Sequence, residues 1–219
     1  EDGYIKGKVK GRLKGCEITL KKISVGATEN IIMAATLAEG ETIIKNAACE
    51  PEISDLSNFL VNAGAEIKGY GTNIIKIKGK KKLRGCEFSI MPDRIEAGTF
   101  ALCVMGCSGN IILENVNDLI CNHLKKIFKP LNVLFLSKKD NGKKLVIKKT
   151  NKFLKNVTIS TKEFPGFPTD LQAQIIASLI KSEGKSVIKE NIFENRFMHV
   201  SELRRMGANL KQNGSKIII

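Results

Sequence analysis

The sequence predicts an α/β fold built from a β-α-β-α-β-β unit that is present three times. The hexapeptide Leu13-Lys14-Gly15-Cys16-Glu17-Ile18 recurs as Leu83-Arg84-Gly85-Cys86-Glu87-Phe88. A weaker copy, Leu154-Lys155-Asn156-Val157-Thr158-Ile159, follows at a similar spacing, so that the starts lie 70 and 71 residues apart. An apolar run with helical spacing comes next in each copy. Repetition at a fixed spacing indicates one structural unit used several times.

The predicted elements follow in the same order in the three copies. The first helix runs toward a glycine, which suits a helix end because glycine adopts positive φ readily. These glycines are Gly40, Gly109 and Gly184. A short β-branched strand is then predicted at residues 42–44, 110–112 and 186–188. A second amphipathic helix is predicted at residues 53–63, 119–128 and 200–206.

A pair of strands across a polar turn closes each copy. In the first copy, strands 66–68 and 74–77 flank Gly71-Thr72-Asn73. Residues 144–148 and 216–219 are their counterparts in the other copies. Residues 4–9 resemble the closing strand of a preceding unit. We therefore interpret the chain as a section of a longer array, in which such units bury their helices by packing side by side.

The charge balance favours an anionic small substrate. The formal net charge is +14, and basic surfaces collect phosphate groups, so a nucleic-acid-binding module is an alternative. However, the lysines are spread over most segments, and the chain has two Tyr and no Trp to stack on bases. Dispersed positive charge steers anions without reading a nucleotide sequence, so we expect no nucleic-acid partner.

Other composition features narrow the class further. No run approaches the roughly 20 apolar residues that cross a bilayer, and the first residues are no signal peptide, so we expect a cytoplasmic protein with no membrane partner. Six cysteines lack Cys-x-x-Cys spacing and are interpreted as reduced thiols. The two histidines, His123 and His199, are far apart, so we predict no metal site and no cofactor.

The most informative stretch is residues 164–174, Phe-Pro-Gly-Phe-Pro-Thr-Asp-Leu-Gln-Ala-Gln. Proline fixes φ and disfavours helix in the preceding residue, so this loop is expected to deliver Asp170 to a helix start. Either Asp170 or Thr169 then caps that helix, which is worth about 1 kcal/mol, or Asp170 places a charge in a cleft. Equivalent junctions at residues 21–30 and 91–99 are also rich in polar groups. Helix N-termini suit phosphate and carboxylate ligands.

Six sequence blocks in order resemble UDP-N-acetylglucosamine 1-carboxyvinyltransferase, the enolpyruvyl transferase that opens peptidoglycan synthesis. They are residues 22–28, 34–40, 46–53, 91–100, 167–174 and 194–200. The resemblance implies an inside-out α/β barrel with two domains of three units each, about three of the six units being present. Residues 1–92 would be the C-terminal part of the first domain, and residues 93–219 the first two-thirds of the second.

The resemblance also assigns roles to residues. Lys22, Ile23, Ser24 and Val25 match the loop that contacts the UDP sugar, and Ile192 matches a further nucleotide-sugar contact. Asp170 matches the carboxylate that meets the reacting sugar hydroxyl, and Arg196 matches a cleft arginine, so both are expected to be catalytic. Arg94, Glu50 and Glu52 match charged residues in or near the cleft, although a structural ion pair between Arg94 and Glu52 is an equal alternative.

The implied reaction moves the enolpyruvyl group of phosphoenolpyruvate to the sugar 3-hydroxyl of UDP-N-acetylglucosamine. The reactive Gly-Gly-Cys loop, an N-terminal Lys-Asn pair and late arginine loops of that family have no match here, so we expect the 219-residue chain alone to be inactive. A non-catalytic remnant is therefore one alternative. The shikimate-pathway enolpyruvyl transferase is another, although its Ser-rich phosphate-binding motifs are not found.

Overall fold

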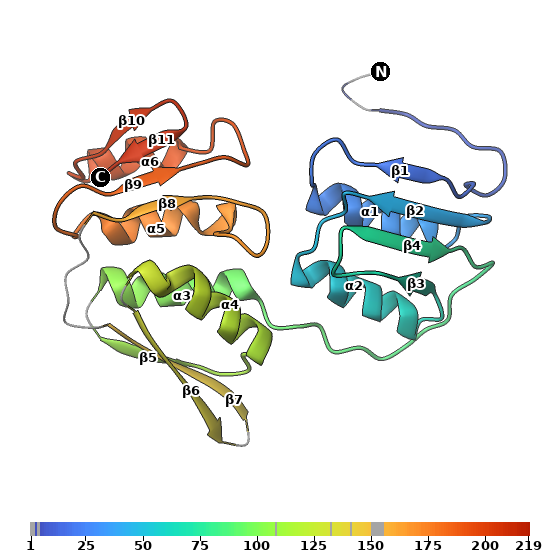
Figure 1. Ribbon diagram of the computed structural model, residues 1–219, viewed down its shortest axis with the longest axis horizontal. Coiled ribbons are helices and arrows are strands. Elements are labelled where there is room, and N and C mark those ends of the chain that lie inside the picture. Colours follow the sequence, from blue (N-terminus) through green and yellow to red (C-terminus); the bar gives the residue numbers. More distant parts are fainter. Residues whose placement is uncertain (1–2, 4, 108, 132, 141, 150–155) are drawn as a thin grey trace. The chain divides into compact units, whose positions relative to one another are not determined.

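The computed structural model describes residues 3, 5–107, 109–131, 133–140, 142–149 and 156–219. The chain divides into two compact units, Glu1–Met91 and Pro92–Ile219 (Figure 1). The assignment of these units to the two domains of an enolpyruvyl transferase stays a prediction.

The first unit contains the complete predicted β-α-β-α-β-β order. Its elements are β1 (Glu17–Thr19), α1 (Val25–Ala35), β2 (Glu41–Lys45), α2 (Pro51–Asn62), β3 (Glu66–Lys68) and β4 (Ile74–Lys78) (Figure 1). The sheet order is β1-β2-β4-β3; β1 and β2 are parallel, and the other pairs are antiparallel. Both helices contact the sheet and each other.

Local sequence accounts for these elements. Ser24 has extended backbone and its Oγ accepts a hydrogen bond from the Ala27 N–H at 3.2 Å, which caps α1. Pro51 stands at the start of α2, where its missing N–H costs nothing. In β4, Ile75 and Ile77 are fully buried and the residues between and beside them are exposed. That alternation is the period of a strand with one covered face.

The second unit holds the other two copies. The middle copy comprises α3 (Arg94–Gly106), β5 (Asn110–Leu113), α4 (Asp118–Phe128), a 3-10 turn (Lys129–Leu131), β6 (Val133–Asp140) and β7 (Gly142–Lys149), with sheet order β5-β7-β6. The last copy comprises β8 (Thr158–Ser160), the 3-10 helix η2 (Thr169–Leu171), α5 (Gln172–Leu179), β9 (Val187–Lys189), α6 (Met198–Arg205), β10 (Lys211–Asn213) and β11 (Lys216–Ile218). Its sheet order, β8-β9-β11-β10, repeats that of the first copy.

The β-α-β-α-β-β order predicts that the middle copy begins with a strand at its hexapeptide, residues 83–88. That prediction is wrong: these residues form no strand, and the middle copy is α-β-α-β-β. This segment is instead held by α2: the Arg84 N–H donates to the Ala63 carbonyl at 2.8 Å, and Phe88 contacts Phe59 edge to face. The Met91 N–H donates to the Asp55 carboxylate at 3.3 Å. Among the described residues, no strand pairs with the edge of β5 that β1 and β8 fill in the other copies. A strand at residues 83–88 would have to pair with that edge of β5, because the backbone N–H and C=O groups of a strand need hydrogen-bond partners.

Two smaller expectations also change. Residues 5–9 form no strand, and Tyr4 lies outside the described residues. Gly40, Gly109 and Gly184 have positive φ, but the preceding helices end three to five residues earlier. These glycines therefore turn the chain toward the next strand and do not cap the helix.

Close packing of α3 on α5 positions the start of α5. Two glycines of α3 make this possible: a Cβ on Gly98 would lie 2.5 Å from a Leu171 side-chain carbon, and one on Gly106 would lie 3.2 Å from the Ser178 Cα. The Ser178 hydroxyl donates to the Leu102 carbonyl at 2.9 Å. The core around this contact includes Leu102, Leu171 and Ile175, none more than 1% exposed.

All six cysteines are free thiols. Among the described residues, no helix has the length and apolar character needed to cross a membrane. In the same part of the chain, no three His, Cys, Asp or Glu side chains are grouped so that they could hold a metal ion.

Candidate active site

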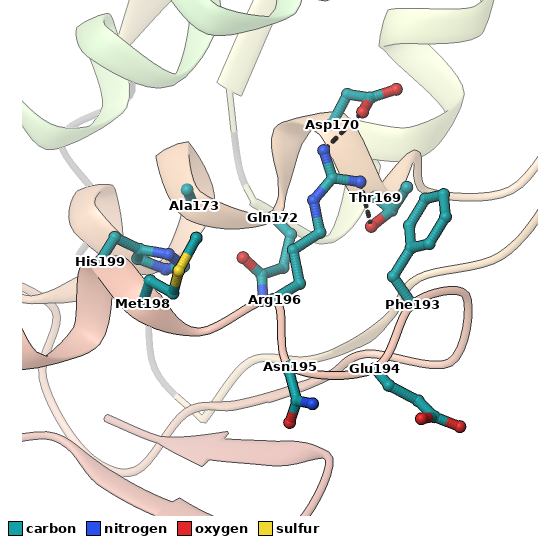
Figure 2. A pocket seen from close by; sticks show the side chains of 10 residues that line it. All are labelled: Thr169, Asp170, Gln172, Ala173, Phe193, Glu194, Asn195, Arg196, Met198 and His199. Atoms are coloured by element: carbon teal, nitrogen blue, oxygen red, sulfur yellow. Dashed lines mark hydrogen bonds and ion pairs between the residues drawn. The ribbon is translucent and has the colours of Figure 1, made fainter. Parts of the chain in front are cut away.

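The second unit contains a pocket of about 600 Å³ between the start of α5 and the segment that leads into α6 (Figure 2). Its lining residues are Thr169, Asp170, Gln172, Ala173, Phe193, Glu194, Asn195, Arg196, Met198 and His199. The two predicted catalytic residues therefore lie in the same pocket.

Arg196 bridges Asp170 and Thr169. Its Nη2 lies 2.7 Å from the Asp170 Oδ1, and its Nη1 donates to the Thr169 Oγ1 at 2.9 Å (Figure 2). The guanidinium carbon also lies 5.1 Å from the centroid of the Phe193 ring. The two charged side chains are 37% and 49% exposed. An ion pair with this exposure contributes at most about 1 kcal/mol, so an anionic ligand can displace Asp170 from the guanidinium.

Asp170 does not cap a helix. The N-cap positions of η2 and α5 belong to Pro168 and Leu171, and neither helix receives a side-chain capping hydrogen bond. The Asp170 side chain points toward Arg196 instead (Figure 2). Of the two interpretations left open by the sequence, the geometry favours a charge placed in a pocket.

Glu190 organises this site and was missed by sequence reasoning. It follows β9 directly, is 3% exposed, and accepts four hydrogen bonds. Its Oε2 accepts from the Thr169 hydroxyl at 2.8 Å. Its Oε1 accepts from the Thr161 hydroxyl and from the backbone N–H groups of Ile192 and Phe193, at 2.8 to 3.1 Å. One carboxylate thus connects the loop that carries Asp170 with the segment that carries Arg196.

Thr161 extends the same network. Its hydroxyl accepts from the Asn191 N–H at 2.8 Å, and its carbonyl accepts from the Asn191 side-chain amide at 3.0 Å. Thr161 is fully buried. The only sequence signal for this arrangement is an acidic residue placed directly after an apolar strand. That signal does not identify its partners.

Two neutral polar side chains line the same pocket. Gln172 is 1% exposed, and neither its Oε1 nor its Nε2 has a hydrogen-bond partner among the described residues. The buried Nε2 of His199 also has no partner within the described part of the chain. Burial, and secondly the positive charge of Arg196, lowers the pKa of His199 below its ordinary value, which favours the neutral imidazole.

The predicted UDP-sugar loop belongs to the first unit. Lys22 and Ile23 are exposed, Ser24 caps α1, and Val25 is its first residue. Ile192 belongs to the second unit, next to the pocket residue Phe193, and is held through its N–H by Glu190. The structure thus brings Asp170 and Arg196 together, with Ile192 close in sequence to the lining.

The other charged residues predicted to lie in or near the cleft are divided between the two units. Glu50 occupies the N-cap position of α2, and Glu52 lies in its first turn. Burial raises the pKa of Glu29 on α1, as do the negative charges of Glu52 and Glu50, so these three carboxylates are neighbours. Arg94 is the buried first residue of α3 in the second unit. The Arg94–Glu52 ion pair stays a prediction.

Comparison with known proteins identifies the class. The family model of EPSP synthase (3-phosphoshikimate 1-carboxyvinyltransferase) matches residues 1–219. The enolpyruvyl transferase NikO from Streptomyces tendae superimposes with a TM-score of 0.78 at 19% identity, over 94% of this chain and 51% of that one. An EPSP synthase from Acinetobacter baumannii superimposes with a TM-score of 0.64 at 22% identity, over 94% and 49%. The chain belongs to the EPSP synthase family and has the enolpyruvyl transferase fold.

Curated relatives carry a more particular name. Proteins named UDP-N-acetylglucosamine 1-carboxyvinyltransferase from Nitratidesulfovibrio vulgaris (strain DP4) and Coxiella burnetii (strain Dugway 5J108-111) are 46% and 47% identical over 219 and 218 residues. A protein named UDP-N-acetylglucosamine 1-carboxyvinyltransferase 1 from Caldanaerobacter subterraneus subsp. tengcongensis is 48% identical over 217 residues. These matches cover 99% to 100% of this chain and 50% to 52% of the relatives. The chain therefore spans about half the length of the curated relatives it matches.

Proposed function

We propose that the protein transfers the enolpyruvyl group of phosphoenolpyruvate to the 3-hydroxyl of UDP-N-acetylglucosamine, in the cytoplasmic synthesis of peptidoglycan that supports cell shape and division. The observation that carries this proposal is the Thr169–Asp170–Arg196 cluster in the pocket of the second unit. The names of relatives at 46% to 48% identity support the choice of substrates.

The chemistry needs a base at the sugar hydroxyl, an acid at the methylene carbon of phosphoenolpyruvate, and cations around its carboxylate and phosphate. Asp170 is suited to accept the hydroxyl proton, and the Arg196 guanidinium is suited to a planar carboxylate or a phosphate. The sugar oxygen then bonds to carbon 2 of phosphoenolpyruvate while its methylene carbon takes a proton. Loss of phosphate and of a proton from that carbon restores the double bond in the product.

The observed ion pair links the two candidate catalytic side chains directly, since the Arg196 Nη2 lies 2.7 Å from the Asp170 Oδ1. An anionic substrate that takes over the guanidinium frees the Asp170 carboxylate to meet the sugar hydroxyl. Contacts of the UDP sugar with Lys22, Ile23, Ser24, Val25 and Ile192 stay predictions from the resemblance.

The test is phosphate release by the full-length protein supplied with UDP-N-acetylglucosamine and phosphoenolpyruvate. The proposal expects release that needs both substrates and falls by about two orders of magnitude in Asp170→Asn. Glu202→Gln, an exposed position on α6, is the matched control and should react normally. Absence of release from the full-length protein would contradict the proposal and favour a non-catalytic remnant.

The shikimate-pathway reaction is the second candidate, because the matching family model carries that name. Its support is weaker, since the EPSP synthase structure is 22% identical and shows the fold alone. The same assay with 3-phosphoshikimate in place of the nucleotide sugar separates the two candidates. Phosphate release with 3-phosphoshikimate, and none with UDP-N-acetylglucosamine, would contradict the proposed acceptor and favour the shikimate-pathway reaction.

A further inference from the structure

Gln172 presents an unusual buried amide to the pocket. It is the first residue of α5, two positions after Asp170, and its side chain lies in the centre of the lining between Arg196 and His199 (Figure 2). Only 1% of the residue is exposed, yet none of its side-chain hydrogen-bonding atoms has a partner among the described residues. Buried polar groups are nearly always hydrogen-bonded, because an unmade bond leaves the cost of desolvation uncompensated. The amide is therefore suited to receive a ligand.

Gln174, two residues further along α5, provides the comparison. Its side chain lies at the α3–α5 contact, where its Nε2 donates to the Thr99 hydroxyl at 3.1 Å, while its Oε1 is buried with no partner among the described residues. One end of the Gln174 amide thus has a structural partner on another helix. In Gln172 neither end has a partner in the described part of the chain, and Gln172 lines the pocket where Gln174 does not.

The surroundings of Gln172 define the group that it can hold. A neutral amide offers both a donor and an acceptor. Ala173 and Met198 place apolar surface in the same lining, and the unpaired His199 Nε2 adds a further neutral polar atom. A short group with an N–H, a carbonyl oxygen and a terminal methyl matches this combination.

We propose that the Gln172 amide binds the acetamido group at carbon 2 of the sugar and so selects N-acetylated acceptors. The inference rests on the proposed function, in which Asp170 meets the 3-hydroxyl. Carbon 2 is adjacent to carbon 3, and Gln172 follows Asp170 by two residues in the same pocket wall. The amide donates to the acetamido carbonyl or accepts from its N–H, while the methyl contacts Ala173 and Met198. Gln172 is thus a specificity-determining residue.

The test compares UDP-N-acetylglucosamine with UDP-glucose, which carries a hydroxyl at carbon 2. Calorimetric titration of the full-length protein gives the Kd for each ligand in the wild type, in Gln172→Met and in the control Gln174→Met. Methionine keeps the volume of glutamine and removes its hydrogen bonds. We expect Gln172→Met to weaken UDP-N-acetylglucosamine about ten- to a hundredfold and UDP-glucose less than about threefold. Gln174→Met should retain the wild-type preference.

Stability of the ligand-free protein separates a binding role from a structural one. Gln172→Met removes no hydrogen bond of the described structure, so its thermal midpoint should equal or exceed that of the wild type. Gln174→Met should melt at a lower temperature than Gln172→Met, because only Gln174→Met loses a hydrogen bond, the one to Thr99.

Three outcomes would overturn the inference. If Gln172→Met weakens the binding of both nucleotide sugars equally, or of neither, Gln172 does not recognise the acetamido group. A lowered midpoint of ligand-free Gln172→Met would assign the amide to the fold. A wild-type protein that does not bind UDP-N-acetylglucosamine would instead contradict the proposed function, and this inference with it.

Discussion

Replacing Glu190 with glutamine tests whether one buried carboxylate holds the site together. The change keeps the shape of the side chain but turns one of its two oxygens into an NH₂ group, which cannot accept. Oε1 accepts three hydrogen bonds, whereas Oε2 accepts one, from Thr169. Glutamine therefore keeps its oxygen at the Oε1 position and loses the bond from Thr169. That hydroxyl is also the acceptor for Arg196.

The expected loss follows from these contacts. A hydrogen bond to a charged group contributes about 1.5–3 kcal/mol, and this one is removed. The three bonds at Oε1 weaken because they are no longer charge-assisted. In the opposite direction, the fold no longer has to bury a charge at a residue that is 3% exposed. These last two effects oppose each other, so Glu190→Gln should lower the free energy of unfolding by about 1.5–3 kcal/mol.

Urea denaturation of the wild type and the variant measures that difference, and hydrogen exchange locates it. Exchange should accelerate at the amides of Ile192 and Phe193, which donate to Glu190, and stay unchanged in β4 of the first unit. Glu194→Gln, an exposed carboxylate in the same segment, is the control and should remain within about 0.5 kcal/mol of the wild type. A Glu190→Gln protein with wild-type stability and wild-type exchange would refute this account of the site.

Three further outcomes are expected. Asp170→Asn should change the free energy of unfolding by less than about 1 kcal/mol, because the ion pair of Asp170 is half-exposed. In single-turnover kinetics the chemical step of the same variant should be slowed by about two orders of magnitude. Normal kinetics would leave Asp170 as a partner of Arg196 only. Burial, and secondly Arg94, lowers the pKa of His123 below its ordinary value of 6.5. The unfolded chain then binds the proton more readily, so stability is fully present above about pH 6.5 and falls at lower pH, and urea titrations should show a smaller fall in His123→Gln. Binding to DNA or RNA, followed by fluorescence anisotropy, should be weak and lost by moderate salt, whereas sequence-selective binding at physiological salt would contradict the assigned class.

Much of the fold was predictable because its signals are local. The spacing of the repeats and the alternation of isoleucines in strand 74–77 reflect which face of each element is covered. Ser24 and Asp93 cap their helices through short-range hydrogen bonds. The resemblance pointed to Asp170 and Arg196, and the structure places both in one pocket. The segment 83–88 shows the limit: its sequence repeats residues 13–18, which lead into β1, yet it forms no strand and Phe88 packs on Phe59 of α2.

Tertiary structure decides which residues of the site are connected by hydrogen bonds. β8 and β9 pair in parallel with Thr158 opposite Val187 and Ser160 opposite Lys189. If this register is continued by one residue, Thr161 lies beside Glu190. The hydrogen bond from the Thr161 hydroxyl to the Glu190 carboxylate therefore joins residues that are 29 positions apart in the sequence. No local pattern encodes that offset, because strand register depends on how the intervening helix packs and on which face is buried. The sequence by itself determined most of the helices and strands and the candidate charged residues, but not the strand expected at residues 83–88. The register of two strands and the burial of Glu190 and Gln172 determined which polar atoms meet, because hydrogen bonds form only between groups that folding brings within about 3 Å.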